Sequence, residues 1–479
     1  MRSTPSSRRA IPLDPALPSQ APVELEVDGG VRIVTANDLD QITPWVLFEQ
    51  EDWFEGELAW LRRVVQPDWQ ILDIGANHGV YAASLARQLG PAGRLVACEP
   101  SPVLQERLRL TIAANRLDSM TVQSIALADT AGSAVLAQSE FTETAHITAS
   151  GAGTRVRTET VDRLVASLDM PCPDLIKIDT EGHERPVLDG ARTTLANGSP
   201  LVMFEVDMRQ PEVTLEAGER LTALGYDIYH YVAGLGVAVP LDSCFIDQFA
   251  LNMLACRPDR AEQLAARGFL LTAEMLADAR AAMPPLPSQA DLPWPSALAT
   301  LEAALPRQQG TPAEQMARLE ALVLSWLGGL RDFSDLMPHP GRLTSLIRLL
   351  WTVGARQAAL EAMRPLLYRF EAGRSAAGEA GLPISAPFDG MPAAADPRWA
   401  DVALIDGMIR LRSHSSFFAD SSVLPALQNL SDHPGFTPRM ERVRQLLRCR
   451  RREQPFILDD PRLGLSRNRR YAQQPRKAA

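Results

Sequence analysis

Two groups of residues in this chain have the types and spacing that ligand chemistry requires. The first is a glycine-rich turn, Ile71-Leu-Asp-Ile-Gly-Ala-Asn-His-Gly79, which is followed along the chain by Glu99. An apolar strand that ends in such a turn and opens a helix is how open α/β sheets hold a nucleotide-like ligand. Gly75 and Gly79 would let the backbone approach that ligand. A carboxylate at the end of the next strand, here Glu99, is placed to accept hydrogen bonds from two ribose hydroxyls.

The glycine turn favours S-adenosylmethionine over a nicotinamide dinucleotide. It lacks the Gly-x-Gly-x-x-Gly pattern of dinucleotide sites, and Asp73 stands inside the strand before the first glycine. A pyrophosphate requires amide donors without a nearby carboxylate, whereas a cationic sulfonium with an amino-acid tail tolerates one. We expect Asp73 and Gly75 to flank the methionine part of the cofactor. Asn77 would cap the following helix or meet the methionine carboxylate.

The adenine side of this site is expected at the end of the third strand. Ala126 and Leu127 follow the apolar segment that begins at Thr121. Ligands of open parallel sheets lie outside the carboxyl ends of the strands. The sequence therefore predicts that these two residues line the adenine.

The second group is an acidic segment after a fourth predicted strand. It contains Asp179, Glu181, His183 and Glu184, and Glu205 ends the next strand. In an extended segment Asp179 and Glu181 would point the same way. They could bind the hydroxyl group of a molecule that accepts the cofactor's methyl group, or remove its proton as general base. They could also hold a divalent metal or serve a structural role. His183 is a further candidate base, because the unperturbed pKa of histidine is about 6.5.

These residues require a sheet to position them, and the chain alternates strand and helix patterns as far as about residue 256. This alternation predicts a parallel sheet covered by helices on both faces. The hydrophobic pattern predicts a hairpin at 23–35, a helix at 45–65 and an irregular hairpin and loop at 133–161. Strands are expected at 71–74, 95–98, 121–126, 174–178, 201–206, 227–232 and 249–255, with helices at 79–89, 102–115, 184–196 and 216–224.

The second half of the chain has a different character. Prolines at 284, 285, 287, 293 and 295 indicate a linker, and helical periodicity follows it. We predict a disordered N-terminus, an α/β domain, a helix with a proline-rich linker, an all-α accessory domain and a basic tail. Their bounds are 1–22, 23–258, 259–297, 298–460 and 461–479.

Composition excludes several classes of protein. The net charge of −10 and the pI of about 5.4 argue against general nucleic-acid binding. The five cysteines are scattered without a zinc or disulfide spacing, which favours a reducing compartment and a cytoplasmic location. The N-terminus lacks the apolar core of a secretory signal. No stretch is long and apolar enough to be expected to span a membrane.

Taken as a set, the motifs resemble those of the FkbM-type methyltransferases over about residues 45–256. The matching segments are 73–79, Ala97-Cys-Glu-Pro100, Asp174-Leu-Ile-Lys-Ile-Asp-Thr-Glu-Gly-His-Glu184, Val187–Ala191, Phe204-Glu205 and Leu251–Ala255. Thr180 departs from the valine that is usual in the family. Position 183 is often alanine there, which ranks His183 below Asp179 and Glu181.

The resemblance implies a class I methyltransferase fold, which is a Rossmann-like, seven-stranded and mostly parallel sheet. It also implies methyl transfer from S-adenosylmethionine to a hydroxyl of a sugar, polysaccharide or secondary metabolite, so the expected partner is a small-molecule or glycan acceptor. Two alternatives stay open, a nicotinamide-dependent oxidoreductase and a scaffold protein with a relic domain. The helical region could bind a protein partner or a second copy of the chain.

Overall fold

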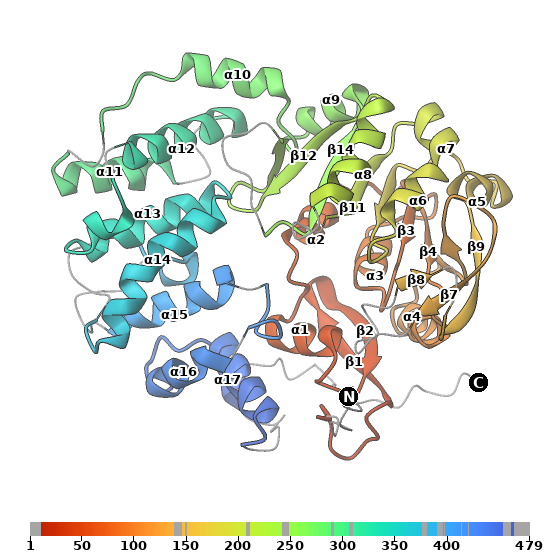
Figure 1. Cartoon of the computed structure of the whole chain (residues 1–479), viewed down its shortest axis with the longest axis horizontal. Helices are drawn as coiled ribbons and strands as arrows, with labels where there is room; N and C mark the ends of the chain where they lie inside the picture. The colour runs from red at the N-terminus through yellow and green to blue at the C-terminus, as the bar shows by residue number, and fades with distance from the viewer. Residues whose placement is uncertain are drawn as a thin grey trace. The chain divides into compact units, whose positions relative to one another are not determined.

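The computed structural model of the protein divides into two compact units (Figure 1). The first unit comprises Met1–Glu205, Ser415–Leu424 and Thr437–Ala479, and the second comprises Val206–His414 and Pro425–Phe436. The structure describes residues 11–137, 146–148, 151–206, 211–241, 249–288, 292–305, 310–328, 330–375, 381–389, 396, 398–412, 414–419, 421–453 and 461–463.

A parallel sheet organises the first unit. Its strands are β3 (Gln70–Ile74), β4 (Arg94–Cys98), β5 (Met120–Gln123), β10 (Leu175–Ile178) and β11 (Leu201–Glu205), and they lie in the order β11-β10-β3-β4-β5. β3 comes first in the sequence, and later strands are added on both of its sides. Such a switch in strand order opens a crevice at the carboxyl ends of the strands. Gly75, Glu99 and Asp179 all follow strands at this end, as predicted.

The helices of this unit lie between its strands. α3 (Val80–Ala86) packs against β4 and β5, and α4 (Pro102–Asn115) packs against β5. The predicted helix at 45–65 is two helices, α1 (Ile42–Gln50) and α2 (Gly56–Val64), because Glu51 adopts a left-handed φ of 60° and ends α1. The predicted helix at 184–196 is likewise divided. The remaining helices of the β3–β11 region are α5 (Val161–Ser167), α6 (Glu184–Asp189) and α7 (Arg192–Asn197).

The N-terminal residues are more ordered than predicted. The hairpin is confirmed as β1 (Pro22–Val27) paired with β2 (Val31–Ala36). Leu13 is fully buried, and the side chain of Asn37 bonds both the N–H and the carbonyl of Asp14. The prediction of disorder is therefore wrong for residues 11–22, while residues 1–10 lie outside the described part.

A second, smaller sheet contains the antiparallel pairing predicted as an irregular hairpin and loop at 133–161. β6 (Ala126–Leu127), β7 (Gly132–Ala137), β8 (His146–Thr148) and β9 (Thr154–Glu159) pair in the order β6-β9-β7-β8. Among the described residues, its buried cluster contains Ala126, Leu136 and Val156, with the half-buried Ile147 packed against it. So few apolar residues give a weak strand pattern, which explains why the sequence indicated a hairpin there but not a sheet of four strands.

The second unit combines three antiparallel strands with helices. β12 (Asp227–Val232) lies between β13 (Val237–Pro240) and β14 (Asn252–Cys256). The prediction was seven strands. The described residues hold eight, namely the five parallel strands of the first unit and these three, because β13 was not predicted. The helices are α8 (Pro211–Ala223), α9 (Pro258–Ala266), α10 (Ala273–Ala282), α11 (Trp294–Ala304), α12 (Pro312–Leu327), α13 (Pro340–Thr352), α14 (Arg356–Glu371), α15 (Arg398–Arg412) and α16 (Leu424–Leu430).

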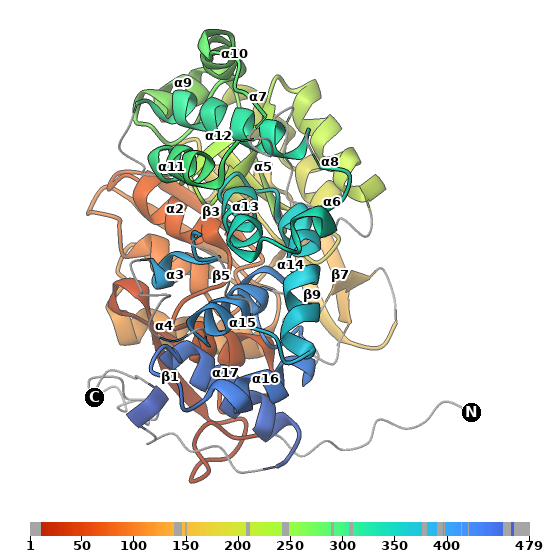
Figure 2. The same cartoon turned by 90° about the vertical axis from the view of Figure 1, so that its left-hand side faces the viewer.

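A hydrophobic cluster joins β12 and β13 of the second unit to the helices α10 and α12. Val232, Val237 and Val239 pack with Leu276 of α10 and Met316 of α12. Figure 2 shows the succession of helices from α9 to α14 in this unit. The C-terminal region is thus helical as expected, but its compact unit includes strands. No helix in the described ranges has the length and apolar character needed to cross a membrane.

The two units divide the chain at other residues than the predicted domains. Residues 206–258 were assigned to the α/β domain but group with the helices. Residues 437–460 were assigned to the helical domain but group with the first unit. α11 begins at Trp294, inside the predicted linker. Of the predicted basic tail, only residues 461–463 lie in the described part.

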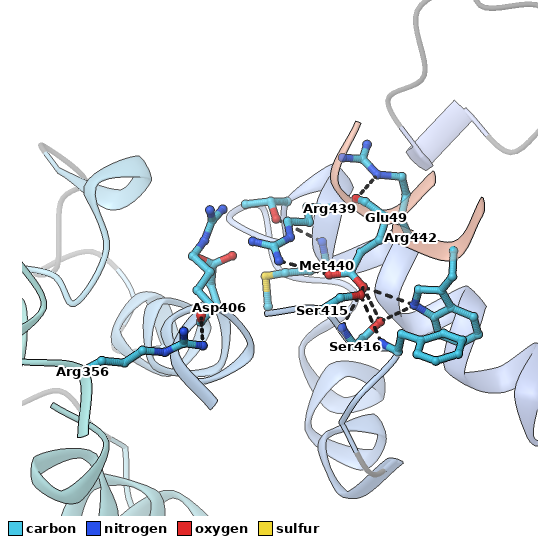
Figure 3. Close-up of polar contacts among 12 residues, drawn as sticks. Glu49, Arg356, Asp406, Ser415, Ser416, Arg439, Met440 and Arg442 are labelled. Carbon is cyan, nitrogen blue, oxygen red and sulfur yellow. Dashed lines mark hydrogen bonds and ion pairs between the residues drawn. The ribbon is translucent and has the colours of Figure 1, made fainter. Parts of the chain in front are cut away.

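A buried glutamate explains why C-terminal residues belong to the first unit (Figure 3). Helix α17 (Pro438–Arg450) packs against α1. The Glu49 carboxylate is fully buried and accepts hydrogen bonds from the Ser415 hydroxyl at 2.8 Å, from the Ser416 N–H at 2.8 Å and from the Ser416 hydroxyl at 2.5 Å. The Arg439 guanidinium donates to its other oxygen at 3.1 Å. The Arg442 guanidinium donates to the Glu49 backbone carbonyl at 2.8 Å.

Glu49→Gln should destabilise the first unit. The amide keeps one acceptor oxygen and replaces the other with a donor. Either the Ser415 and Ser416 donors or the Arg439 guanidinium therefore lose their partner, and the ion pair with Arg439 loses its negative charge, at a cost of about 2–4 kcal/mol. Denaturant unfolding should therefore begin at a lower concentration. Glu361→Gln, at an exposed site on α14, is the control and should change stability by less than about 0.5 kcal/mol. Equal midpoints for the two variants would contradict this role of Glu49.

Candidate active site

The two glycines of the first motif are required by contacts within the protein. Gly75 has a φ of +82°, and a Cβ atom there would lie 1.7 Å from the carbonyl oxygen of Asp179. Gly79 has a φ of +81°, and its Cβ would lie 2.4 Å from Cδ2 of Leu108. The turn after β3 and the segment after β10 therefore touch at Gly75. Approach of a ligand to these glycines stays a prediction.

Glu99 is held as a preorganised acceptor at the end of β4. Its side chain is buried, and one carboxylate oxygen accepts the Asn77 N–H at 2.9 Å while the other accepts the Ser101 N–H at 2.7 Å. Burial raises the pKa of Glu99 to about 7, although both N–H bonds lower it. Each carboxylate oxygen has two lone pairs, so each can accept one further hydrogen bond. This arrangement suits a vicinal diol.

Asn77 contributes its backbone to this arrangement. Its φ of 53° directs the N–H toward Glu99, and its side-chain oxygen accepts the His78 N–H at 2.7 Å. The N-cap of α3 is Gly79, without a side-chain bond, so Asn77 does not cap the helix in the predicted way.

Asp73 is a buried anion beneath the turn. It is 1% exposed, and neither carboxylate oxygen accepts a hydrogen bond of normal geometry. The nearest cation is the Lys177 ammonium, at 3.9 Å from Oδ1. Burial raises the pKa of Asp73 to about 6, and Lys177 opposes this shift. With so little surface, Asp73 can attract a cationic ligand chiefly through its electric field.

Ala126 and Leu127 do not lie at the end of the third strand. β5 ends at Gln123, and the two residues form β6, which pairs in parallel with β9. Both are buried, and Ala126 packs with Leu136 and Val156. Their contact with adenine stays a prediction.

Three carboxylates meet beyond β10 and β11. Asp179, Glu181 and Glu205 each place one oxygen within 4.8 Å of the other two. Glu181 has a φ of 55°, so a turn and not an extended segment brings it beside Asp179. Burial raises the pKa of Glu205, and the charges of Asp179 and Glu181 add to this effect. Oxygen ligands at this spacing could hold a divalent cation.

The other two predicted residues lie apart from this group. The Glu184 carboxylate is buried and accepts hydrogen bonds from the Thr180 N–H and hydroxyl and from the Gly182 N–H. It therefore shapes the loop. His183 is half-buried at the start of α6, and burial lowers its pKa while Glu184 and Asp129 oppose the shift.

The comparison with protein families decides the class of this domain. Residues 73–228 match the family model described as the methyltransferase FkbM domain. The chain carries an FkbM methyltransferase domain. The matched range starts at Asp73 and ends in β12, which is narrower than the range of 45–256 predicted from the motifs.

Solved structures similar to this chain include three methyltransferases. The FkbM methyltransferase of Methylobacillus flagellatus KT is 16% identical with a TM-score of 0.29, and the match covers 40% of this chain and 44% of that one. The O-methyltransferase of Bacillus cereus in complex with SAH is 15% identical with a TM-score of 0.28, covering 42% and 80%. The SAM-dependent O-methyltransferase of Thermotoga maritima is 12% identical with a TM-score of 0.28, covering 50% and 94%. No curated protein matches the chain.

Sequence reasoning missed one charged residue of the FkbM domain. Lys177 lies in β10 with 4% of its side chain exposed, and its ammonium is 2.7 Å from an Asp179 oxygen. The same ammonium lies 4.9 Å from the centroid of the Tyr81 ring, and the Tyr81 hydroxyl donates to Glu55 at 2.6 Å. A lysine within the apolar run Leu175–Ile178 was the available signal, because a buried charge requires a partner.

Gly75→Ala should destabilise the FkbM domain far more than backbone conformation alone explains. Gly225→Ala is the matched control, because Gly225 has a φ of +83° and no atom within 4 Å of its Cβ position. A left-handed alanine costs about 1–2 kcal/mol at both sites. The collision with Asp179 adds about 1–3 kcal/mol at Gly75 only. Thermal and denaturant unfolding measure the difference, and equal losses would show that the close approach is absent in solution.

Proposed function

We propose that this protein is an S-adenosylmethionine-dependent O-methyltransferase acting on a hydroxyl of a sugar, polysaccharide or secondary metabolite. One observation carries the proposal. Two groups lie at the same edge of the sheet, where the strands end. They are Glu99, whose carboxylate can accept hydrogen bonds from a diol, and the carboxylates of Asp179, Glu181 and Glu205. The FkbM match supports methyl transfer and gives no support to an oxidoreductase or to a relic scaffold.

The residues around the glycine turn suit this cofactor. The carboxylate of Glu99 would accept the two ribose hydroxyls. Asp73, Gly75, Asn77 and Gly79 would border the methionine part, where the buried charge of Asp73 favours a cation. Ala126 and Leu127 would line the adenine. When bound, the cofactor supplies an electrophilic methyl group on a sulfonium.

The acidic group would prepare the acceptor. In-line approach of a hydroxyl to a methyl group requires orientation and removal of the hydroxyl proton. We assign these tasks to Asp179 or Glu181, with His183 as a less favoured base. Glu205, whose pKa is raised, holds its proton at higher pH than an exposed glutamate and can donate a hydrogen bond to the acceptor. A protein partner for the helical region and a cytoplasmic location stay predictions.

Glu99→Ala should weaken binding of S-adenosylmethionine about 10–150-fold, the equivalent of about 1.5–3 kcal/mol for charge-assisted bonds. The hydroxyls stabilise ionised Glu99, whose pKa in the free protein is about 7. Binding should therefore release a proton below this pH, and affinity should rise as pH increases toward it.

Calorimetry in buffers of different ionisation enthalpy measures both effects. Glu106→Ala, at an exposed position on α4, should keep wild-type affinity and proton release. Wild-type affinity in the Glu99 variant would remove the ribose assignment.

Asp179→Asn should reduce turnover by about 10²–10⁴ if this residue is the base. Glu181→Gln should do so if the role belongs to Glu181. Asp118→Asn, an exposed change in the same domain, should leave turnover unchanged. Product formation from a panel of hydroxylated acceptors is followed by mass spectrometry.

A chelator distinguishes the metal alternative. Activity that is lost with chelator and restored by Mg²⁺ or Mn²⁺ would make the carboxylates ligands of a cation. Full activity in both carboxylate variants would refute the proposal and leave His183 and Glu205 as candidates.

A further inference from the structure

Lysine is almost absent from this protein. The chain has 48 lysines and arginines, and lysine occurs only at positions 177 and 477. All the others of these 48 side chains are arginines. The buried cation of the candidate active site is therefore an amine in a chain whose remaining lysine and arginine side chains, apart from Lys477, are all guanidinium groups.

The surroundings of Lys177 suit a compact ammonium. Lys177 pairs in register with Asp73 of β3, and its Nζ lies between Asp179 at 2.7 Å and Asp73 at 3.9 Å. The Tyr81 ring covers it, and the Tyr81 hydroxyl is fixed by Glu55. An ammonium is a point charge with three rotatable donors, whereas a guanidinium is larger and planar. The space between Asp73, Asp179 and the Tyr81 ring therefore suits the compact charge of a lysine ammonium.

Asp179 has little freedom apart from its side-chain torsions. Its backbone N–H donates to the Ile74 carbonyl at 3.0 Å, and its own carbonyl lies against Gly75. One carboxylate oxygen bonds Lys177, while 30% of the side chain remains exposed. The ammonium therefore sets the direction in which the second oxygen points.

We propose that Lys177 is a positioning residue, which orients the Asp179 carboxylate toward the acceptor and itself touches neither acceptor nor cofactor. This assignment rests on the proposed function. A positioning residue differs from a simple counterion in its effect. A counterion would contribute to folding only, whereas a positioning residue also sets the geometry of the Asp179 carboxylate.

Kinetics of a double-mutant cycle test the coupling. Lys177→Met should lower turnover at least about tenfold, and Lys177→Met/Asp179→Asn should be no slower than Asp179→Asn alone, because residues that act as a unit are not additive. Affinity for S-adenosylmethionine should change less than about threefold. Lys177→Arg should restore only part of the turnover. The proposal would be overturned if the two substitutions lowered turnover by factors that multiply in the double variant. Full turnover in Lys177→Met would also overturn it.

A spectroscopic measurement tests the contact without activity. Protein labelled with ¹³C and ¹⁵N in lysine gives two side-chain signals, which Lys477→Arg assigns. Asp179→Asn should shift the Lys177 signal, and Asp118→Asn should not. An unmoved signal overturns the proposal even where Lys177→Met fails to fold. A shifted signal without methyl transfer to any acceptor supports the contact and places the failure in the proposed function.

Discussion

The acidic edge of the sheet depends on the ion pair between Lys177 and Asp179. Asp73 lies in β3, opposite Lys177 of the neighbouring strand β10, and Asp179 follows that strand. Burial and the charge of Asp179 raise the pKa of Asp73, which stays at about 6 because Lys177 opposes them. The ammonium at 2.7 Å from Asp179 and 3.9 Å from Asp73 offsets charges that would otherwise repel. Contact of Gly75 with the Asp179 carbonyl adds a steric link between the same two segments. The glycine turn after β3 and the segment after β10 are thus linked by the charge of Lys177 and by the close approach of Gly75 to the Asp179 carbonyl.

The ends of the chain contribute to the same unit. Glu49 of α1 is satisfied by Ser415, Ser416 and Arg439, which lie more than 360 residues away in the sequence. The Arg450 guanidinium also stacks over the Trp45 ring at 4.0 Å. The segment from 206 to 414 is therefore inserted between two parts of one compact unit. Removing the C-terminal residues would take the serine and arginine donors from this buried carboxylate and leave the Trp45 indole N–H, which donates to it at 3.3 Å.

Local sequence predicted the parts of the site that depend on local structure. β3, β4, β10 and β11 are apolar runs of the kind that parallel sheets bury on both faces, and Glu99 is placed by the strand before it. The left-handed Glu181 was missed because its conformation departs from the extended segment assumed there. The partners of Glu49 were missed because contacts so distant in sequence leave no periodic pattern. Lys177 was readable as a charge within an apolar strand.

The most direct test of the account is a calorimetric titration of the full chain with S-adenosylmethionine and, separately, with NAD. The account predicts saturable binding of one S-adenosylmethionine per chain, tighter at pH 7.5 than at pH 6 because Glu99 must be ionised, and no binding of NAD. Saturable binding of NAD without binding of S-adenosylmethionine would contradict it.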